Sequence, residues 1–407
     1  MKETKLLAGM KVLDLSRQLA GPFATMTMAD LGAEVIKVET ASGDDSRYWG
    51  PFMEEESCYY WSCNRGKKSI VVDLKSSEGK EIIKRLARES DVLIENFREG
   101  VMTRLGLDYE VMREINPKLV YCHITGFGET GPDARRPAVD IAIQAATGLM
   151  SITGYPDQDP VRIGLSLADL ATGTFGIVGI LSAYINAMKT GKGQKVSLSL
   201  METMVSYLVY HAQGYLSKGI IPQKYGSGIQ NIEPYRAVRT KNGYIALGVG
   251  NDTNFGRLCG VMGRPELAAD PRFLHNADRW ANRDALLEII GEFFARQDND
   301  EIERIMIEKG IPCGAVKNVG EVLESEQVKA MGLVVDVPHP TRGSIPMVRA
   351  PLNFSGAGNC SESWPPFLAQ DTAAVLARLG YSEAQIAELA AKGAVKLGAV
   401  PGQDKEG

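Results

Sequence analysis

The chain has 407 residues, 44% of them hydrophobic and 23% charged, which are ordinary values for a globular protein long enough for about two domains. Its net charge of −5 excludes the basic character of general nucleic-acid binders and of proteins that bind anionic membranes. The first residues contain no sustained apolar stretch, so we expect no signal peptide and a cytoplasmic location.

The cysteines and histidines give no sign of a metal site. The six cysteines form no C-x-x-C pair, and they do not group with the four histidines. Zinc and iron–sulfur sites need such spacings. We therefore predict neither, and we interpret His123, which falls in a strand pattern, as a core imidazole.

Strand and helix patterns alternate along the first 200 residues. Such alternation predicts right-handed βαβ units and a mostly parallel sheet. The most apolar helix pattern contains three glycines, and we interpret it as a buried helix and not as a membrane span. The predicted strands are 10–15, 34–39, 69–74, 91–97, 118–125 and 195–200, and the predicted helices are 23–31, 77–88, 109–115, 170–188 and one running through 215.

The pattern changes at residues 217–228, which are rich in glycine and polar residues and are typical of a linker. Beyond it, a strand at 244–249 and helices at 283–296 and 299–309 predict a smaller α/β module. From residue 330 onward, strand-like pieces precede two final helices at 371–379 and 382–392.

Two glycine-containing turns bear on dinucleotide binding. The first turn, 16–22, lacks the G-x-G-x-x-G spacing that lets a backbone approach a pyrophosphate. That spacing occurs at 126–131, but Pro132 and polar residues follow it where a helix should begin. We therefore predict a sharp glycine-rich turn there and no nicotinamide site.

Basic and aromatic residues follow two neighbouring strand patterns. Lys75 comes after one strand, and Phe97 and Arg98 come after another, at the edge where open α/β sheets bind ligands. An aromatic ring can stack on a purine, and Arg or Lys can pair with phosphates. The alternative, a solvated rim of scattered cations, stays open.

A single carboxylate, Asp169, interrupts the small and apolar residues of segment 164–173. It precedes a helix whose apolar positions 175, 178, 181, 185 and 188 share one face. Near a helix N-cap the backbone N–H groups favour an ionised carboxylate, so Asp169 is either an ordinary capping residue or a nucleophile. Asp140 is a candidate neighbour of Asp169, with a loop or cap role as its alternative. Gly173, Gly176 and Gly179 indicate close helix packing.

Twelve short segments, in order along nearly the whole chain, resemble the class III CoA-transferases, the family of formyl-CoA and carnitine/bile-acid CoA-transferases. No single segment is decisive, but the series is specific. The segments are 7–15, 20–22, 31–39, 62–70, 92–97, 116–120, 126–128, 167–173, 190–194, 234–240, 310–314 and 371–375.

The resemblance implies an α/β fold with a large Rossmann-like, CoA-binding domain formed by residues 1–216 and 330–407, and a small domain formed by 226–329. It also implies that two ring-shaped protomers interlock as a homodimer, or as a heteromer with a related subunit. Acyl-CoA and a free carboxylic acid would be the substrates, with no metal and no redox cofactor.

The resemblance also implies roles for particular residues. Asp169 would attack the donor thioester, and Gln18, Asp140 and a lid at Gly226 and Gly228 would support the site. Backbone amides would stabilise the oxyanions. The implied CoA contacts are Leu74, Lys75, Asn96, Phe97, Arg98, Arg104 and Leu105, with Arg47 near the phosphates.

Three functions stay open under this resemblance. The first is CoA transfer to an organic acid, with succinyl-CoA as a candidate donor. Leu19 stands where formyl-CoA transferase has a glutamine and the glycine loop is short, which favours an acid larger than oxalate or formate. The second is a catalytically silent partner subunit. The third is an α-methylacyl-CoA racemase, disfavoured because Val139 replaces the histidine base of that family.

Overall fold

The computed structural model describes residues 5–358, 360–361 and 363–400. The chain divides into two compact units. The first comprises Met1–Thr147, Gly164–Ala212 and Lys329–Gly407, and the second comprises Gly148–Ile163 and Gln213–Val328. Segment 148–163 joins the second unit because the chain around Gly226 packs on it: the Gly226 N–H donates to the Gly154 carbonyl over 3.0 Å.

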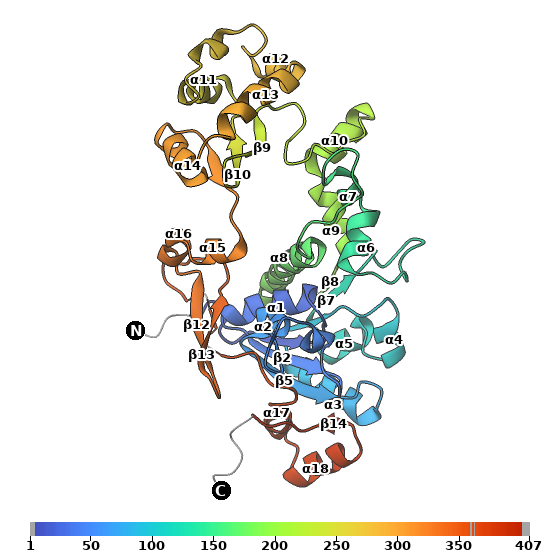
Figure 1. Cartoon of the computed structure of the whole chain (residues 1–407). Coiled ribbons are helices and arrows are strands. Elements are labelled where there is room, and N and C mark those ends of the chain that lie inside the picture. The colour runs from blue at the N-terminus through green and yellow to red at the C-terminus, as the bar shows by residue number, and fades with distance from the viewer. Residues whose placement is uncertain (1–4, 359, 362, 401–407) are drawn as a thin grey trace. The chain divides into compact units, whose positions relative to one another are not determined.

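A seven-stranded sheet forms the centre of the first unit, in the order β14-β5-β2-β1-β6-β7-β8 (Figure 1). All neighbouring strands pair in parallel except β14, which is antiparallel to β5. The predicted α/β fold with a mostly parallel sheet is confirmed. The strands are β1 (Lys11–Asp14), β2 (Glu34–Glu39), β5 (Lys67–Val72), β6 (Val92–Glu95), β7 (Val120–Thr125), β8 (Lys195–Ser199) and β14 (Val395–Lys396).

Buried strands rich in Val, Ile and Leu make this sheet, as a parallel sheet covered on both faces requires. Helices complete the crossovers, and α3 turns Ile82, Ile83 and Leu86 into the core. The helices are α1 (Ala20–Asp30), α2 (Cys58–Asn64), α3 (Ser77–Glu89), α4 (Val101–Leu105), α5 (Tyr109–Ile115), α6 (Asp140–Ala146), α8 (Leu167–Thr190), α9 (Leu200–Tyr207), α17 (Thr372–Arg378) and α18 (Glu383–Ala391), with a 3₁₀ turn at Asp45–Tyr48. Two hairpins, β3–β4 (Phe52–Met53, Glu56–Ser57) and β12–β13 (Val334–His339, Gly343–Val348), lie outside the sheet.

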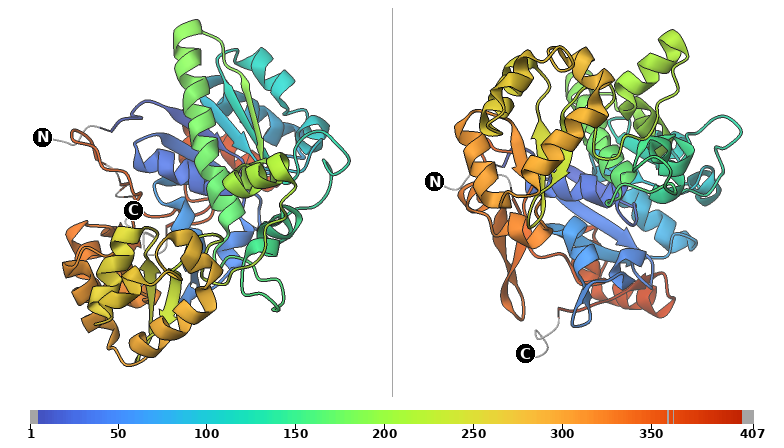
Figure 2. Two further views of the ribbon diagram at one scale, coloured as in Figure 1. Left: turned by 90° about the horizontal axis from the view of Figure 1, so that it is seen from above. Right: turned by 45° about the horizontal axis from the view of Figure 1, so that its top comes forward.

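The long helix α8 runs beside the sheet and packs on β7, β8 and α1 (Figure 2). Its buried face consists mainly of small residues, among them Ala171, Gly173 and Gly176. The prediction of a fully buried helix is therefore wrong for its other face, where Phe175, Val178, Ile185 and Met188 are exposed. Small residues face inward because the backbones approach closely: a Cβ on Gly173 would lie 2.5 Å from the Ala20 carbonyl oxygen.

Within the described residues, α8 is the one helix long and apolar enough to cross a membrane. Helices in the cores of soluble proteins pass the same test. The contacts of its small-residue face with β7, β8 and α1 are those of a helix that covers a sheet.

The strand order determines where ligands can bind. Successive strands run outward from β1 in one direction and from β6 in the other, so the chain reverses direction between these two strands. Doubly wound sheets bind ligands outside the carboxyl ends of the strands at such a point. The turn after β1 and the turn after β6 lie at this edge.

The second unit is built around a three-stranded antiparallel sheet in the order β11-β10-β9. Phe255, Phe273 and Phe294 are fully buried in its core. Its elements are α7 (Leu149–Ile152), β9 (Tyr235–Arg239), β10 (Tyr244–Gly248), α11 (Asp252–Val261), a 3₁₀ turn at Pro265–Ala269, α12 (Asn276–Ala281), α13 (Arg283–Phe294), α14 (Asn299–Glu308), β11 (Cys313–Ala315) and α15 (Val319–Leu323), while α10 (Val209–Lys218) and α16 (Glu326–Ala330) span the unit boundaries.

Candidate active site

Asp169 is the third residue of α8, and Ser166 occupies the N-cap. Its side chain is half-buried, and among the described residues none donates a hydrogen bond to its carboxylate. Burial and the nearby charge of Asp140 raise the pKa of Asp169 to about 7. The prediction that the helix terminus favours the ionised form is therefore wrong, because desolvation and a like charge outweigh the helix dipole.

Asp140, the first residue of α6, caps the helix that carries Asp169. Its Oδ1 accepts a hydrogen bond of 2.8 Å from the Ala168 N–H, and its Oδ2 accepts one of 2.7 Å from Gln144 Nε2. Asp140 thus satisfies a backbone donor in the first turn of α8 that the N-cap side chain leaves open. The predicted proximity of the two acids agrees with this arrangement.

Helix α2 contributes a phenol to the same surroundings. Burial together with the charges of Cys63, Asp169 and Asp140 raises the pKa of Tyr59 to about 12. The ring of Tyr59 stands edge-on to Trp49, with the ring centroids 5.2 Å apart. A neutral phenol near two carboxylates is a hydrogen-bond donor that could stabilise charge on a substrate oxygen.

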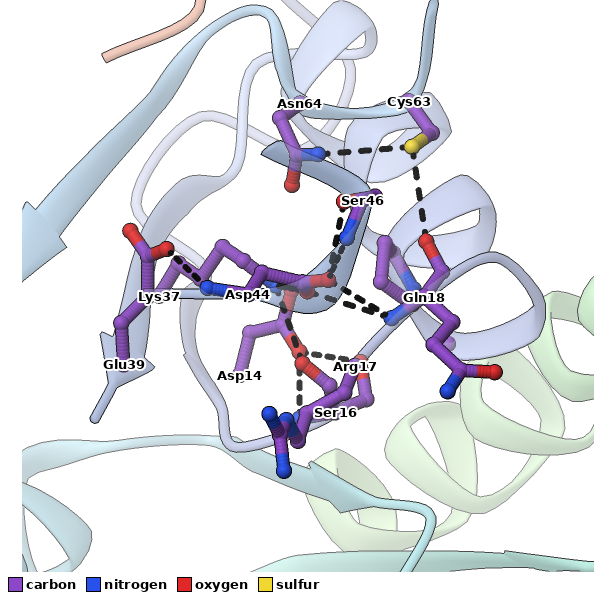
Figure 3. Close-up of polar contacts among 12 residues, drawn as sticks. Asp14, Ser16, Arg17, Gln18, Lys37, Glu39, Asp44, Ser46, Cys63 and Asn64 are labelled. Atoms are coloured by element: carbon purple, nitrogen blue, oxygen red, sulfur yellow. Dashed lines mark hydrogen bonds and ion pairs between the residues drawn. The ribbon is translucent and has the colours of Figure 1, made fainter. Parts of the chain in front are cut away.

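The turn between β1 and α1 approaches this region. Gln18 adopts a left-handed φ of 67°, and its N–H donates to both carboxylate oxygens of Asp44 over 3.1 Å. In Figure 3 its side chain points away from the polar network around Asp14 and Lys37. Since Gly173 of α8 packs against Ala20, directly after this turn, the turn and the first turns of α8 are close neighbours.

A buried network of ion pairs holds the turn between β1 and α1 (Figure 3). Lys37 Nζ lies 2.8 Å from Asp44 Oδ2 and donates to the Ser16 carbonyl over 2.9 Å. Lys67 Nζ lies 3.0 Å from Asp14 Oδ2. Burial alone would raise the pKa of Asp14, but the ammonium groups of Lys67 and Lys37 outweigh it and lower that pKa. The four charges compensate one another and fix the backbone of residues 16–18.

The predicted CoA contacts gather at the carboxyl edge of the sheet. Leu74 and Phe97 line a narrow cleft together with Arg17, Lys37 and Asp44. Asn96 forms two hydrogen bonds with the turn after β1. Its Oδ1 accepts from the Arg17 N–H over 2.8 Å, and its Nδ2 donates to the Arg17 carbonyl over 2.9 Å. The cleft lies over the carboxyl ends of β5, β2 and β1 and reaches Phe97, which follows β6.

Cations suited to phosphates surround this cleft. Lys75, Arg98 and Arg104 are exposed, and within the described part of the chain their side chains form no ion pair. Leu105, at the end of α4, packs against the core with Phe97. Exposed cations without carboxylate partners can bind phosphate oxygens without breaking an existing pair.

Arg47 differs from these cations. Its Nε and Nη2 contact the two Glu39 oxygens at 2.8 and 2.7 Å, and its guanidinium stacks on Tyr60 at 3.7 Å. It lines a separate cavity of about 640 Å³ between the two hairpins. The structure thus gives Arg47 a structural ion pair, and its predicted place near the phosphates stays a prediction.

Gly226 and Gly228 belong to the second unit, so their predicted role as a lid stays a prediction. Gly226 has a left-handed φ of 64°, and a Cβ there would lie 2.6 Å from the Tyr155 ring. A glycine is therefore required at this position for backbone and packing reasons alone.

Sequence reasoning missed three contributors to the site. Tyr59 lies in a helix too short to give a periodic pattern, and Lys37 and Lys67 resemble surface lysines in sequence although both are buried. The placement of Lys37 inside the predicted strand 34–39 was an available signal, because charged residues rarely occupy buried strands without partners. Lys67 precedes the predicted strand 69–74 and gave no such signal, since only the structure extends β5 back to it.

Comparisons with known proteins agree on one family. The profile of CoA-transferase family III matches residues 7–372. The chain is 41% identical over 398 residues to the human succinyl-CoA:glutarate CoA-transferase, covering 97% of this chain and 91% of that protein. It is 40% identical to the succinate–glutarate CoA-transferase of Agrobacterium fabrum, covering 92% and 95%. The crystal structure of a CAIB/BAIF family protein from Brucella suis superposes with a TM-score of 0.84 at 41% identity, covering 93% of this chain and all of that one.

Proposed function

This chain belongs to CoA-transferase family III and transfers CoA between an acyl-CoA and a carboxylic acid, and we propose that the carboxylate of Asp169 carries the acyl group and then the CoA. One observation carries this proposal: a half-buried carboxylate with its pKa raised to about 7, at the start of α8. A raised pKa makes the ionised carboxylate a stronger nucleophile, because the anion is poorly solvated.

The proposed transfer has four steps. Asp169 attacks the donor thioester carbonyl and expels CoA thiolate, leaving an acyl–aspartyl anhydride. The thiolate attacks the aspartyl carbonyl, forming an aspartyl-CoA thioester and releasing the donor acid. The acceptor carboxylate attacks that thioester, giving a second anhydride and the thiolate again. The thiolate then attacks the acceptor carbonyl, which produces the new acyl-CoA and restores the Asp169 carboxylate.

The surroundings of Asp169 suit such exchanges. Donors around the site can stabilise the oxyanions, and Tyr59, which keeps its proton to a pKa of about 12, is one candidate. Asp140 is engaged with the Ala168 N–H and Gln144, so it positions the first turn of α8 and leaves Asp169 as the reacting acid. Gln18, in the turn that neighbours the first turns of α8, completes the proposed site within the first unit.

We place CoA at the carboxyl edge of the sheet. The adenine would lie against Leu74 and Phe97 in the narrow cleft, and the phosphates would pair with Lys75, Arg98 and Arg104. The position of this cleft at the carboxyl ends of the parallel strands supports the assignment.

The acids exchanged are proposed to be dicarboxylic, with succinyl-CoA as donor. The human and Agrobacterium relatives are named for succinyl-CoA or succinate and glutarate, and both share about 40% of their residues with this chain. A panel of mono- and dicarboxylic acids offered with succinyl-CoA, with the CoA esters identified by mass spectrometry, tests this choice. Preference for monocarboxylic acids would contradict it.

We further propose that two copies interlock as a dimer in the cytoplasm. The exposed face of α8, with Phe175, Val178, Ile185 and Met188, is a large apolar surface that a second subunit would remove from water. A related chain could take the place of one copy, in which case this chain alone would be inactive. Activity of the purified chain by itself, with a dimeric mass in solution, would exclude that alternative.

Trapping the intermediate tests the role of Asp169 directly. The protein is incubated with acyl-CoA and treated with hydroxylamine, and the modified residue is identified by peptide mass spectrometry. We expect a hydroxamate at Asp169. A modification at another residue would overturn the assignment, and proton exchange at the α-carbon without acid exchange would indicate the racemase, for which Val139 offers no base.

A further inference from the structure

The glycine motif at 126–131, to which the proposed transfer steps assign no role, contributes the partly buried carboxylate of Glu129 to a cluster around the buried His123. Glu129 Oε1 lies 2.6 Å from His123 Nδ1 on β7 and 2.5 Å from Lys195 Nζ on β8. The other ring nitrogen of His123, Nε2, lies 3.3 Å from the Phe97 carbonyl oxygen and 3.5 Å from Glu95 Oε1. His123 is buried, with 5% of its surface exposed.

The two ring nitrogens of His123 each face an acceptor. A carbonyl oxygen only accepts, so the contact with Phe97 is a hydrogen bond that Nε2 donates. On the other side of the ring, Nδ1 lies within hydrogen-bond distance of Glu129 Oε1. Burial would raise the pKa of Glu129, but hydrogen bonds from Lys195, His123 and Ser197 outweigh it and lower that pKa. The ring thus bridges the Phe97 backbone and the Glu129 carboxylate.

These contacts bear on metal binding too. The ligand atoms of Glu99, His123 and Glu129 lie within 4.8 Å of one another, a spacing that could hold a cation. Both ring nitrogens of His123 already contact protein acceptors, however, and Lys195 supplies the positive charge beside Glu129. The cluster is better suited to holding the backbone.

The backbone that it holds is the turn bearing the proposed CoA contacts. The Phe97 N–H donates to Glu95 Oε2 over 2.8 Å, and the Phe97 carbonyl accepts from His123. The backbone N–H and carbonyl of Phe97 are thus both held by buried side chains, while its ring lines the cleft. Arg98, the next residue, is exposed at the surface.

We propose that His123 is a positioning residue for CoA: its ring, anchored by Glu129 of the glycine motif, holds the Phe97 carbonyl and so presents Phe97 and Arg98 to the bound nucleotide. This inference rests on the proposed CoA site. His123 itself touches neither the acyl group nor Asp169 and takes no part in the chemical steps.

Two matched substitutions separate the hydrogen bond of Nε2 with Phe97 from the contact of Nδ1 with Glu129. In His123→Gln the amide nitrogen reaches the position of Nε2 and keeps the donor to Phe97, whereas in His123→Asn the shorter amide reaches only the position of Nδ1. We expect His123→Asn to raise the KM for acyl-CoA and the Kd for CoA about tenfold, the loss of one hydrogen bond. The kcat and the KM for the acid should stay within about twofold, and His123→Gln should recover much of the loss.

Two further variants keep the test decisive. Ile124→Val alters a buried neighbour on the same strand and serves as the control for general destabilisation, which should lower the melting temperature without changing the KM. Glu129→Gln, which removes the anchoring charge, should raise the KM for acyl-CoA in the same direction as His123→Asn.

The outcomes distinguish this inference from the proposed CoA site. Arg98→Ala must also raise the KM for acyl-CoA; if it does not, the CoA site is misplaced and the inference is lost with it. If Arg98→Ala has its effect while His123→Asn and Glu129→Gln leave the KM unchanged, or lower kcat instead, the site stands and the role of His123 is refuted.

Discussion

Replacing Asp169 by asparagine should abolish turnover and, at the same time, stabilise the fold at alkaline pH. Asparagine has nearly the same shape but neither charge nor nucleophilic oxygen. The pKa of Asp169 is raised from 3.8 to about 7, so the folded chain binds this proton more tightly than the unfolded chain does. Stability therefore falls as the pH rises from about 4 to about 7, and above 7 the full cost of the buried charge is present.

The size of this cost follows from the same values. One pH unit corresponds to about 1.4 kcal/mol, so the difference between 3.8 and about 7 gives at most about 4 kcal/mol. Because the carboxylate is only half-buried, solvent screening reduces the effect, and we expect about 1 to 2 kcal/mol. In a chain of this length that raises the melting temperature by a few degrees at pH 8.

The assay compares melting temperatures of the wild type and Asp169→Asn at pH 5 and pH 8, beside turnover at pH 8. We expect the stabilisation to be much larger at pH 8, with turnover reduced at least about 10³-fold. Asp140→Asn is the matched control: its carboxylate accepts two hydrogen bonds, so that variant should be less stable at both pH values. An Asp169→Asn protein that is no more stable at pH 8, or that keeps its activity, would refute the reasoning.

Three further predictions concern the same helix. The kcat/KM should rise with pH through about 7 and then level off, because Asp169 attacks as the anion. In Asp140→Asn, which removes a like charge, the midpoint of this profile should move to lower pH. A flat profile between pH 6 and 8 would contradict this prediction. Gly173→Ala should lower both the melting temperature and kcat, because the new Cβ would lie 2.5 Å from the Ala20 carbonyl oxygen and push α8 away from α1. Gly176→Ala is the control: the nearest atom to its Cβ lies 3.9 Å away, so the melting temperature and kcat should change little. Thr172→Val should leave the melting temperature unchanged or higher, because the fully buried Thr172 hydroxyl has no hydrogen-bond partner among the described residues; a clear loss of stability would reveal a partner.

Much of the first unit could be predicted from the sequence. Its strands are rich in Val, Ile and Leu, and amphipathic helices such as α3 separate them, so the alternation alone predicts the parallel sheet. The alternation also predicts the edge at which ligands bind, because parallel strands place their carboxyl ends together. Phe97 could therefore be identified from the strand pattern, whereas Leu74, which lines the same cleft, was implied only by the family resemblance.

Helix α8 shows where the pattern misleads. Its glycines indicated close packing, which the structure has at Gly173 and Gly176, but the interpretation of the whole helix as buried fails at Phe175 and Val178, which are exposed. Periodicity identifies which residues share a face of a helix, and it does not reveal which of two apolar faces meets the core. Close approach of two backbones decides that, and it depends on a partner helix distant in sequence.

The raised pKa of Asp169 also could not be predicted from the sequence. Local position near a helix terminus suggested an ionised Asp169, while the structure adds burial and the charge of Asp140, which is 29 residues away in the chain. Likewise Lys37 and His123 are ordinary polar residues in a strand pattern, and Lys67 precedes one, until the fold supplies their carboxylate partners. Local sequence determines periodicity and turn chemistry, because these depend on neighbouring residues; desolvation and ion pairing depend on residues that only the tertiary structure brings together.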